Sequence, residues 1–334
     1  MSGRRHMFAR ALFLGTLLAV AIPNFASAAE QDFATWLKGL RSEAAEKGIR
    51  AQTLDRALSG IQPIPRVVEL DRKQPEFTLT FDQYITRVVP QSRVDTGKAR
   101  LRENRELLDE IGKKYGVQPR FIVAFWGIES DFGRLDGGFS VVQSLATLAF
   151  DGRRSAFFRA ELIRALRIID QGHTTADTMR GSWAGAMGHF QFMPSTFESF
   201  AIDYDGDGKR DIWSNKKDAF ASAANYLSRS GWKSDQTWGR QVTLPAGFNK
   251  SLIGLETKKP LEEWSKLGIT RSDGGPLPTT RSDVSGSVVV ADNKNGAGPA
   301  FLIYDNYRVT LKWNRSTFFA VAVGTLAERI GDGS

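Results

Sequence analysis

The segment at residues 119–128, PRFIVAFWGI, constrains the fold more than any other part of the chain, because it is apolar on nearly every side. A helix with this pattern is buried all round, and Pro119 suits its first turn. The 334 residues, 41% of them hydrophobic and 25% charged, are enough for one large domain or two moderate ones with a sizeable core. The sequence therefore predicts a globular protein that encloses this helix.

Helical periodicity dominates the chain from residue 30 to about residue 235. Apolar residues recur at helical spacing in 33–59, 100–116, 141–150, 155–170, 195–202 and 217–231. Pro63, Pro65 and Pro75 prevent one continuous helix between the first two of these segments. Residues 61–85 are therefore predicted to be a connecting segment.

The pattern changes from about Trp238 onward. Three stretches, 241–245, 286–292 and 300–314, read as short strands separated by clusters of Gly, Pro, Ser and Asp. Residues 316–330 then read as a closing helix. We expect a mainly α protein with a small strand-containing subdomain.

The first 28 residues have the pattern of a secretory signal. Arg4, Arg5 and Arg10 precede the apolar run ALFLGTLLAVAI, and the small residues ASA at 26–28 form a cleavage site. A retained membrane anchor is the alternative, but the run is about a dozen residues long and a span needs about 20. We expect cleavage before Ala29 and a soluble, exported protein.

Charge and cysteine content narrow the possible partners. The chain contains no Cys, which rules out a disulfide after export and a lipid-attachment cysteine after the signal. Its formal charge of +8 falls to +5 without the three Arg of the signal, and this mild excess favours a polyanionic partner such as the cell wall. Nucleic acid is not expected, because Lys and Arg are scattered among Asp and Glu.

Glu129 follows the buried segment directly, in FWGIESDFGR at 125–134. A carboxyl group at the end of a buried helix loses hydration, and desolvation raises its pKa. A carboxylic acid that stays protonated near neutral pH can donate a proton to a leaving oxygen. The alternative is a structural ion pair with a nearby arginine, such as Arg134 or Arg153.

A second candidate is the loop GSWAGAMGHFQFMPSTF at 181–197. Its small residues let the backbone approach a ligand closely. Ser182 and Gln191 offer hydrogen bonds, and the aromatic residues among them offer faces on which a sugar ring could stack. This mixture suits a neutral ligand rich in hydroxyl and amide groups, although a tight loop packed into the core would have the same composition.

The stretch DYDGDGKRD at 203–211 resembles a calcium loop. Asp203, Asp205 and Asp207 occupy positions 1, 3 and 5, Gly208 gives the sharp turn, and the Lys209 carbonyl would be the ligand at position 7. Position 12 is Ser214 instead of a bidentate Glu, and the next carboxylate is Asp218. We expect a structural Ca²⁺ site here, with a solvated Asp turn as the alternative.

Other chemistries lack the residues that they need. His173 and His189 are the only histidines after the signal and there is no Cys, so a zinc cluster or a Cys nucleophile is not expected. The chain has no GxSxG motif and no glycine-rich phosphate loop that opens a helix. The acid chemistry of Glu129 therefore remains the best supported.

Taken together and in order, these stretches resemble the membrane-bound lytic transglycosylase B type of lytic murein transglycosylases. The resemblance extends from LDRKQPEF at 70–77 through SLATLAFDGRRSAFF and ANYLSRSGW to LKWNRSTFFAVAVGTLAERI at 311–330. It implies a lysozyme-like catalytic core at 117–240, with an N-terminal helical segment at 29–116 and a small α/β subdomain with a closing helix at 241–334. It also implies a soluble, periplasmic member that is not a lipoprotein.

The family cuts the MurNAc-GlcNAc bond of peptidoglycan without water and leaves a 1,6-anhydro-MurNAc end. By this resemblance Glu129 is the catalytic acid and base, no cofactor takes part in the chemistry, and the partner is the peptidoglycan glycan strand. The implied substrate-binding residues are Ser182, Met187, Gln191, Asn306, Trp313 and Asn314, and the implied calcium ligands are Asp203, Asp205, Asp207, Lys209 and Asp218.

Two other functions remain open from the sequence. A lysozyme-type hydrolase would need a second carboxylate to activate water, and Asp131 and Asp136 are close enough in sequence to serve. A wall-binding protein that kept the groove but lost catalysis is the other alternative.

Overall fold

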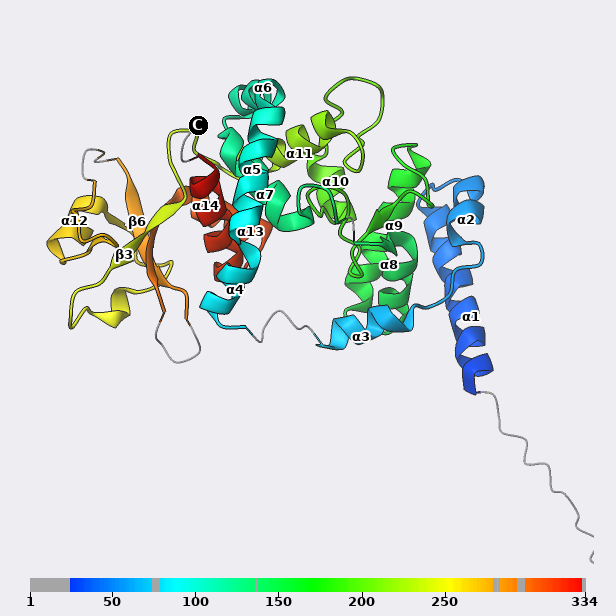
Figure 1. Cartoon of the computed structure of the whole chain (residues 1–334). Helices are drawn as coiled ribbons and strands as arrows, with labels where there is room; N and C mark the ends of the chain where they lie inside the picture. The colour runs from blue at the N-terminus through cyan, green and yellow to red at the C-terminus, as the bar shows by residue number, and fades with distance from the viewer. Residues whose placement is uncertain are drawn as a thin grey trace, which may run out of the picture.

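A computed structural model describes residues 25–73, 79–135, 137–278, 281, 283–292 and 298–331, with side chains described from Asp32 onward. Residues 1–24 of the predicted signal, and Asp136, lie outside the described residues. The described parts form an elongated molecule, with a sheet-bearing subdomain at one end, helices in the middle and a second helical group at the other end (Figure 1). No helix in the described ranges is long and apolar enough to cross a membrane.

The middle of the molecule is built around α7 (Pro119–Ser130), the helix that the sequence predicted to be buried. Its residues Phe121, Phe125 and Trp126 are at most 1% exposed, and Pro119 is its first residue. The surrounding helices are α5 (Gln91–Glu103), α6 (Arg105–Tyr115), α11 (Lys216–Arg229) and α14 (Thr317–Gly331). The prediction is confirmed, and this packing fixes the position of the last turn of α7.

The helices that precede α7 fall into two groups (Figure 1). The first group is α1 (Phe25–Glu46), α2 (Ala51–Leu58) and α3 (Pro65–Lys73), which lie beside α8 (Val141–Phe150) and α9 (Ser155–Asp170). The second is α4 (Phe81–Val88) with α5 and α6, beside α14 and α7. The polypeptide from 29 to 116 therefore contacts two different parts of the molecule.

Two predicted helices, 33–59 and 100–116, are each interrupted once. The first is broken between α1 and α2, where Gly48 has a φ of 86°. The second is broken at Asn104, whose side-chain amide donates to the Arg100 carbonyl oxygen at 2.8 Å. Gly and Asn both offer the backbone an alternative to helix geometry, so each break has a local cause.

A buried ion pair holds the first helical group in place. Asp71 on α3 is 1% exposed and accepts hydrogen bonds from Arg153 Nε at 2.7 Å and Arg154 Nη2 at 2.6 Å. The bond from Arg153, helped by that from Arg154, outweighs burial and lowers the pKa of Asp71. Because both arginines lie in the connection between α8 and α9, this bridge fastens α3 to those helices.

The sheet subdomain contains five antiparallel strands in the order β4, β6, β7, β3, β5. The strands are β3 (Gly239–Thr243), β4 (Lys259–Pro260), β5 (Thr270–Arg271), β6 (Ser285–Val290) and β7 (Ala300–Ile303), and the helix α12 (Leu261–Lys266) accompanies them. Trp264 and Leu302 lie in a second, separate apolar core here and are completely buried. The predicted strands at 241–245 and 286–292 are therefore confirmed, with shifted ends.

The third predicted strand, 300–314, is wrong beyond Ile303, because its second half is the helix α13 (Asp305–Trp313). Its β-branched and aromatic residues suggested a strand. The buried positions Asn306, Tyr307, Val309 and Thr310 instead repeat at helical spacing, and burial against α14 decides the outcome.

The remaining predicted helices are confirmed within two residues at each end. They are α8, α9, α10 (Pro194–Phe200), α11 and α14. The short strands β1 (Phe139–Ser140) and β2 (Arg180–Gly181) pair with each other, and a short 3₁₀ turn, η2, covers Lys250–Leu252. The expected fold class, mainly α with a small sheet, is therefore confirmed.

Candidate active site

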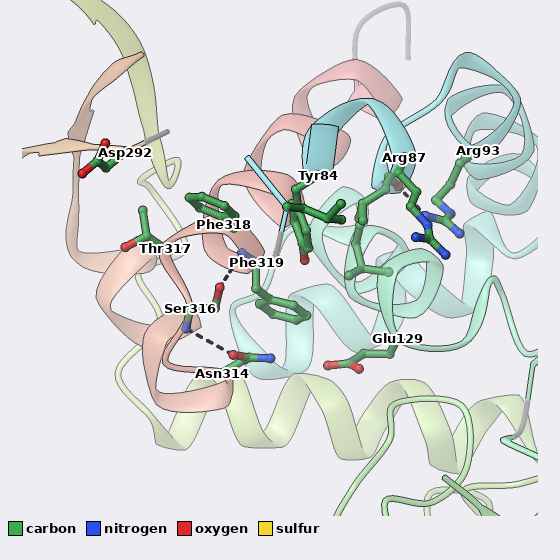
Figure 2. A pocket seen from close by; sticks show the side chains of 13 residues that line it. Tyr84, Arg87, Arg93, Glu129, Asp292, Asn314, Ser316, Thr317, Phe318 and Phe319 are labelled. Atoms are coloured by element: carbon green, nitrogen blue, oxygen red, sulfur yellow. Dashed lines mark hydrogen bonds between the residues drawn. The ribbon is translucent and has the colours of Figure 1, made fainter. Parts of the chain in front are cut away.

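Glu129 lies in the last turn of α7, where the buried helix meets a groove. The helix ends because Asp131 and Phe132 have φ values of 50° and 60°, a left-handed conformation that turns the chain away. Glu129 is half-buried and lines a groove of about 650 Å³. Figure 2 shows its carboxylate pointing toward Asn314. The fold thus exposes the carboxyl group of Glu129 to the groove, while the helix that carries it is buried.

Trp313, at the end of α13, holds this carboxyl group. Its indole Nε1 donates a hydrogen bond to Glu129 Oε1 at 2.7 Å. The indole ring lies 4.6 Å from the ring of Phe125 and 4.7 Å from that of Tyr226, measured between centroids. Because α7, α11 and α13 all contribute to this cluster, the direction of the Nε1–H group is fixed by packing.

A polar network joins the end of α7 to the loop at 181–197. The Ser130 hydroxyl donates to the His189 carbonyl oxygen at 2.7 Å and accepts from the Gly133 amide at 2.9 Å. The Trp126 indole donates to His189 Nδ1 at 2.8 Å. Burial, together with the charge of Lys216, lowers the pKa of His189, which favours the neutral ring that can accept this bond.

The arginines that the sequence offered as partners of Glu129 bind other carboxylates. Arg134 donates to Asp131 Oδ2 at 2.7 Å, and Arg153 belongs to the Asp71 bridge. Arg93 donates to the other oxygen, Asp131 Oδ1, at 3.3 Å. Burial alone would raise the pKa of Asp131, but the two arginines outweigh it and lower the pKa. Both oxygens of Asp131 are thus committed to guanidinium groups.

The acidic loop brings four carboxylates together. One oxygen from each of Asp203, Asp205, Asp207 and Asp218 lies within 4.8 Å of the others. Asp218 is completely buried at the start of α11, and its two oxygens accept hydrogen bonds from the Tyr204 and Asp211 amides, both at 2.8 Å. Burial and the nearby aspartates raise the pKa of Asp218. Hard oxygen donors in this number suit Ca²⁺, so the donor set fits the expected ion, and the fold supplies the late carboxylate that the spacing alone left uncertain.

Comparison with known proteins identifies the family. The family model described as "Transglycosylase SLT domain" matches residues 32–328. The chain belongs to this transglycosylase family. It is 30% identical to membrane-bound lytic murein transglycosylase B of Escherichia coli over 254 residues, which are 74% of this chain and 66% of that protein. The aligned part therefore spans just under two thirds of that relative.

Solved structures of lytic transglycosylases have the same fold. SltB3 from Pseudomonas aeruginosa, in complex with NAG-NAM-pentapeptide, matches with a TM-score of 0.87 and 47% identity, covering 91% of this chain and 80% of that chain. Escherichia coli Slt35, in complex with calcium, matches with a TM-score of 0.74 and 26% identity, covering 88% of this chain and 92% of that chain. The predicted family and its lysozyme-like core are confirmed.

Four of the six expected substrate-binding residues are at least partly exposed to solvent. Asn314 lines the groove with Glu129, and Trp313 is bonded to Glu129. Ser182 and Gln191 are half-buried in the loop at 181–197, where the Ser182 hydroxyl accepts from the Ala186 amide at 3.1 Å and Gln191 Nε2 donates to the Gly188 carbonyl oxygen at 3.0 Å. These two side chains also hold the loop in shape.

For the other two expected residues, Met187 and Asn306, the structure corrects the prediction. Both are completely buried, so neither side chain can contact a sugar in this conformation. The Asn306 side chain accepts from the Lys233 amide at 2.7 Å and donates to the carbonyl oxygens of Lys233 and Gln236. The Asn306 side chain therefore links α13 to the turn after α11, which is a structural role.

Sequence reasoning missed the wall of the groove that α4 and the start of α14 supply. Tyr84 and Arg87 come from α4, and Phe318 comes from α14; Figure 2 shows them above Glu129 and Asn314. A signal for α4 existed in the sequence, because Thr80 and Gln83 form a capping box at its start. Nothing in the sequence indicated that this helix would meet residues more than 200 positions later.

Proposed function

We propose that the chain cleaves the β-1,4 bond between MurNAc and GlcNAc in peptidoglycan without water and leaves a 1,6-anhydro-MurNAc end. The observation that carries this proposal is the hydrogen bond of 2.7 Å from the neutral Trp313 indole to Glu129, at the edge of the groove. A neutral donor fixes the position of the carboxyl group without placing a second formal charge on it.

In the proposed mechanism Glu129 acts twice. Protonated Glu129 first donates its proton to the glycosidic oxygen, the bond from that oxygen to C1 of MurNAc breaks, and the N-acetyl group of the substrate stabilises the positive charge at C1. The carboxylate then takes the proton of the C6 hydroxyl as this oxygen bonds to C1. The proton returns to Glu129, so one carboxyl group completes the cycle and no water is consumed.

The position of the other carboxylates favours this reaction over hydrolysis. An inverting or retaining hydrolase needs a second carboxylate beside the scissile bond. Asp131 is bonded to two arginines. Among the described residues that line the groove, the other carboxylate is Asp292, which Figure 2 places at the opposite end from Glu129. The SltB3 complex with NAG-anhNAM-pentapeptide supports an anhydro product in this family.

Two further parts of the function are proposals on separate grounds. Ca²⁺ would be held by the carboxylates of Asp203, Asp205, Asp207 and Asp218 with the Lys209 carbonyl, where it would fasten the loop and take no part in bond cleavage; the acidic cluster and the calcium complex of Slt35 support this. Export to the periplasm, where peptidoglycan lies, is supported by the signal pattern at 1–28.

The decisive experiment is mass spectrometry of the products of purified peptidoglycan. We expect fragments that end in anhydro-MurNAc, one water lighter than reducing fragments. Fragments that end in reducing MurNAc would establish a lysozyme-type hydrolase instead. Unchanged product release by Glu129→Gln would remove Glu129 from the mechanism, and no release by the wild type would favour a binding protein.

A further inference from the structure

The groove carries a local excess of positive charge at its catalytic end. Arg87 and Arg93 both line it together with Glu129, and Arg134 lies close by, bonded to Asp131. Asp131 is the carboxylate that Arg93 and Arg134 share. Two of these three guanidinium groups are therefore paired with one carboxylate, beside a glutamic acid that must be protonated for the first step of the proposed reaction.

Arg93 and Arg134 are occupied, whereas Arg87 is available. The Arg93 side chain is 19% exposed and donates to Asp131 Oδ1 and to the Val88 carbonyl oxygen. Arg87 is exposed, and among the residues that the structure describes no carboxylate lies within ion-pair distance of it. Figure 2 shows Arg87 and Arg93 reaching the same end of the groove. An anion placed there would contact an uncommitted guanidinium group.

The placement of Arg87 on α4 links this charge to a sugar-binding surface. Tyr84 and Arg87 are three residues apart on one helix, so their side chains lie on the same face. Both line the groove, and Tyr84 is half-buried while Arg87 is exposed. An aromatic ring suits the face of a sugar, and a planar guanidinium group suits a carboxylate.

A glycan strand with stem peptides carries its charge on the peptides. The lactyl carboxyl of each MurNAc is consumed in an amide bond to the peptide, so the sugars themselves are uncharged. The peptide retains at least its terminal carboxylate. A cation in the groove thus has no charged partner on the sugars, but it has one on the peptide.

Resting on the proposed function, we propose that Arg87 binds a carboxylate of the stem peptide and makes this transglycosylase prefer strands whose peptides are acidic. Arg87 is then a specificity residue and takes no part in the proton transfers. Its contribution belongs to substrate binding, and it should weaken with ionic strength because the pair is exposed to solvent.

The test uses two glycan fragments that differ only in charge: one bears a pentapeptide with free carboxyl groups, and the other bears the same pentapeptide with every carboxyl converted to a carboxamide. For the wild type we expect a KM about three- to tenfold lower for the acidic fragment, as for a single hydrogen-bonded charge pair. Arg87→Gln should raise the KM for the acidic fragment to that of the amide, with kcat unchanged. Arg87→Lys should keep part of the preference.

The matched control is Arg102→Gln, which removes an exposed arginine of α5 that is not among the residues lining the groove; it should leave the preference intact. A wild type without preference, or a preference that survives Arg87→Gln, would overturn the inference. Equal weakening of both fragments by Arg87→Gln would assign Arg87 to the sugar instead. If the wild type releases anhydro product from neither fragment, the proposed function fails, and the dissociation constants of both fragments for Glu129→Gln still decide whether acidic peptides are preferred.

Discussion

The end of α7 and the loop at residues 203–218 both gather carboxylates, but they surround them with opposite partners. At the end of α7, Asp131 is bonded to two arginines, and Glu129 meets the neutral indole of Trp313. In the loop, the groups that bond the four aspartates are backbone amides and the Asn215 side chain.

The difference shows how the same functional group is directed to different tasks. Where the protein supplies its own cations, the carboxylate of Asp131 is held in ion pairs. Glu129, which accepts a hydrogen bond from a neutral donor, is the group proposed to transfer protons. Where the groups that bond the carboxylates are dipoles, as in the acidic loop, several carboxylates close together repel one another, and an external cation would relieve the repulsion. Predictions that separate these two regions follow in order of expected effect.

The largest effect is expected for Glu129→Gln. This variant keeps the shape of the side chain but cannot transfer a proton, so kcat should fall by a factor on the order of 10² to 10⁴. Release of anhydro fragments measures the rate, and a thermal melt checks that the fold is intact. Asp205→Asn, in the exposed part of the acidic loop, is the control: its kcat should stay near that of the wild type, and a similar loss in both variants would contradict the division of roles.

Trp313→Phe should lower kcat by roughly tenfold, because a hydrogen bond to a charged or reacting group contributes about 1.5 kcal/mol or more. KM should change less, since the phenyl ring keeps much of the packing. The matched control is Trp238→Phe, which removes a similar bond of 3.0 Å from an indole to Glu328 in a residue that is 2% exposed. If both variants lose activity in proportion to stability, Trp313 has only a structural role.

Calcium should raise the melting temperature of the wild type relative to the same protein in chelator. A ligand bound only by the native state adds about 2.7 kcal/mol at a concentration 100 times its Kd. Asp218→Asn should lose most of this shift, because it removes the buried member of the cluster. An undiminished shift in Asp218→Asn, or no shift in the wild type, would remove the proposed site.

The smallest expected effect is on the pH dependence of the free energy of unfolding, to which Asp131 and Asp218 should contribute with opposite signs. The pKa of Asp131 is lowered in the folded state, so its contribution to stability is present above the unfolded pKa of about 3.9 and is lost as pH falls through the folded pKa. The pKa of Asp218 is raised, so without calcium its cost is present above the folded pKa and is relieved as pH falls through it.

Unfolding free energies in chelator, measured for the wild type and for each Asp→Asn variant between about pH 3 and pH 6, test these signs. The advantage of the wild type over Asp131→Asn should grow as pH rises. The free energy of unfolding of the wild type, relative to that of Asp218→Asn, should fall as pH rises. The same slope for both pairs would show that the two regions treat their carboxylates alike.

Much of the secondary structure could be predicted from local patterns. The helix at 119–130 was predictable because it is apolar all round, and α8, α9, α10 and α11 because their apolar residues repeat at helical spacing. The helix at 305–313 could not be predicted, because its β-branched residues favour a strand whereas its burial pattern favours a helix. Burial against α14 decided that case.

The candidate site divides in the same way. Glu129 and the three aspartates at 203–207 could be identified as candidates, because short-range spacing in the sequence is enough to single them out. The burial of Asn306, the bond from Trp313 to Glu129, and the arrival of Arg87 in the groove could not, because each depends on contacts between residues that are far apart in the chain.

By itself, then, the sequence determined which side chains could do chemistry: one carboxyl at the end of a buried helix, an acidic loop, and no alternative nucleophile or zinc cluster. Only the tertiary structure decided which partner each of them meets. The physical reason is that spacing along the chain fixes which residues share a helix face or a loop, whereas the charge state and direction of a carboxyl group depend on neighbours that packing brings from elsewhere.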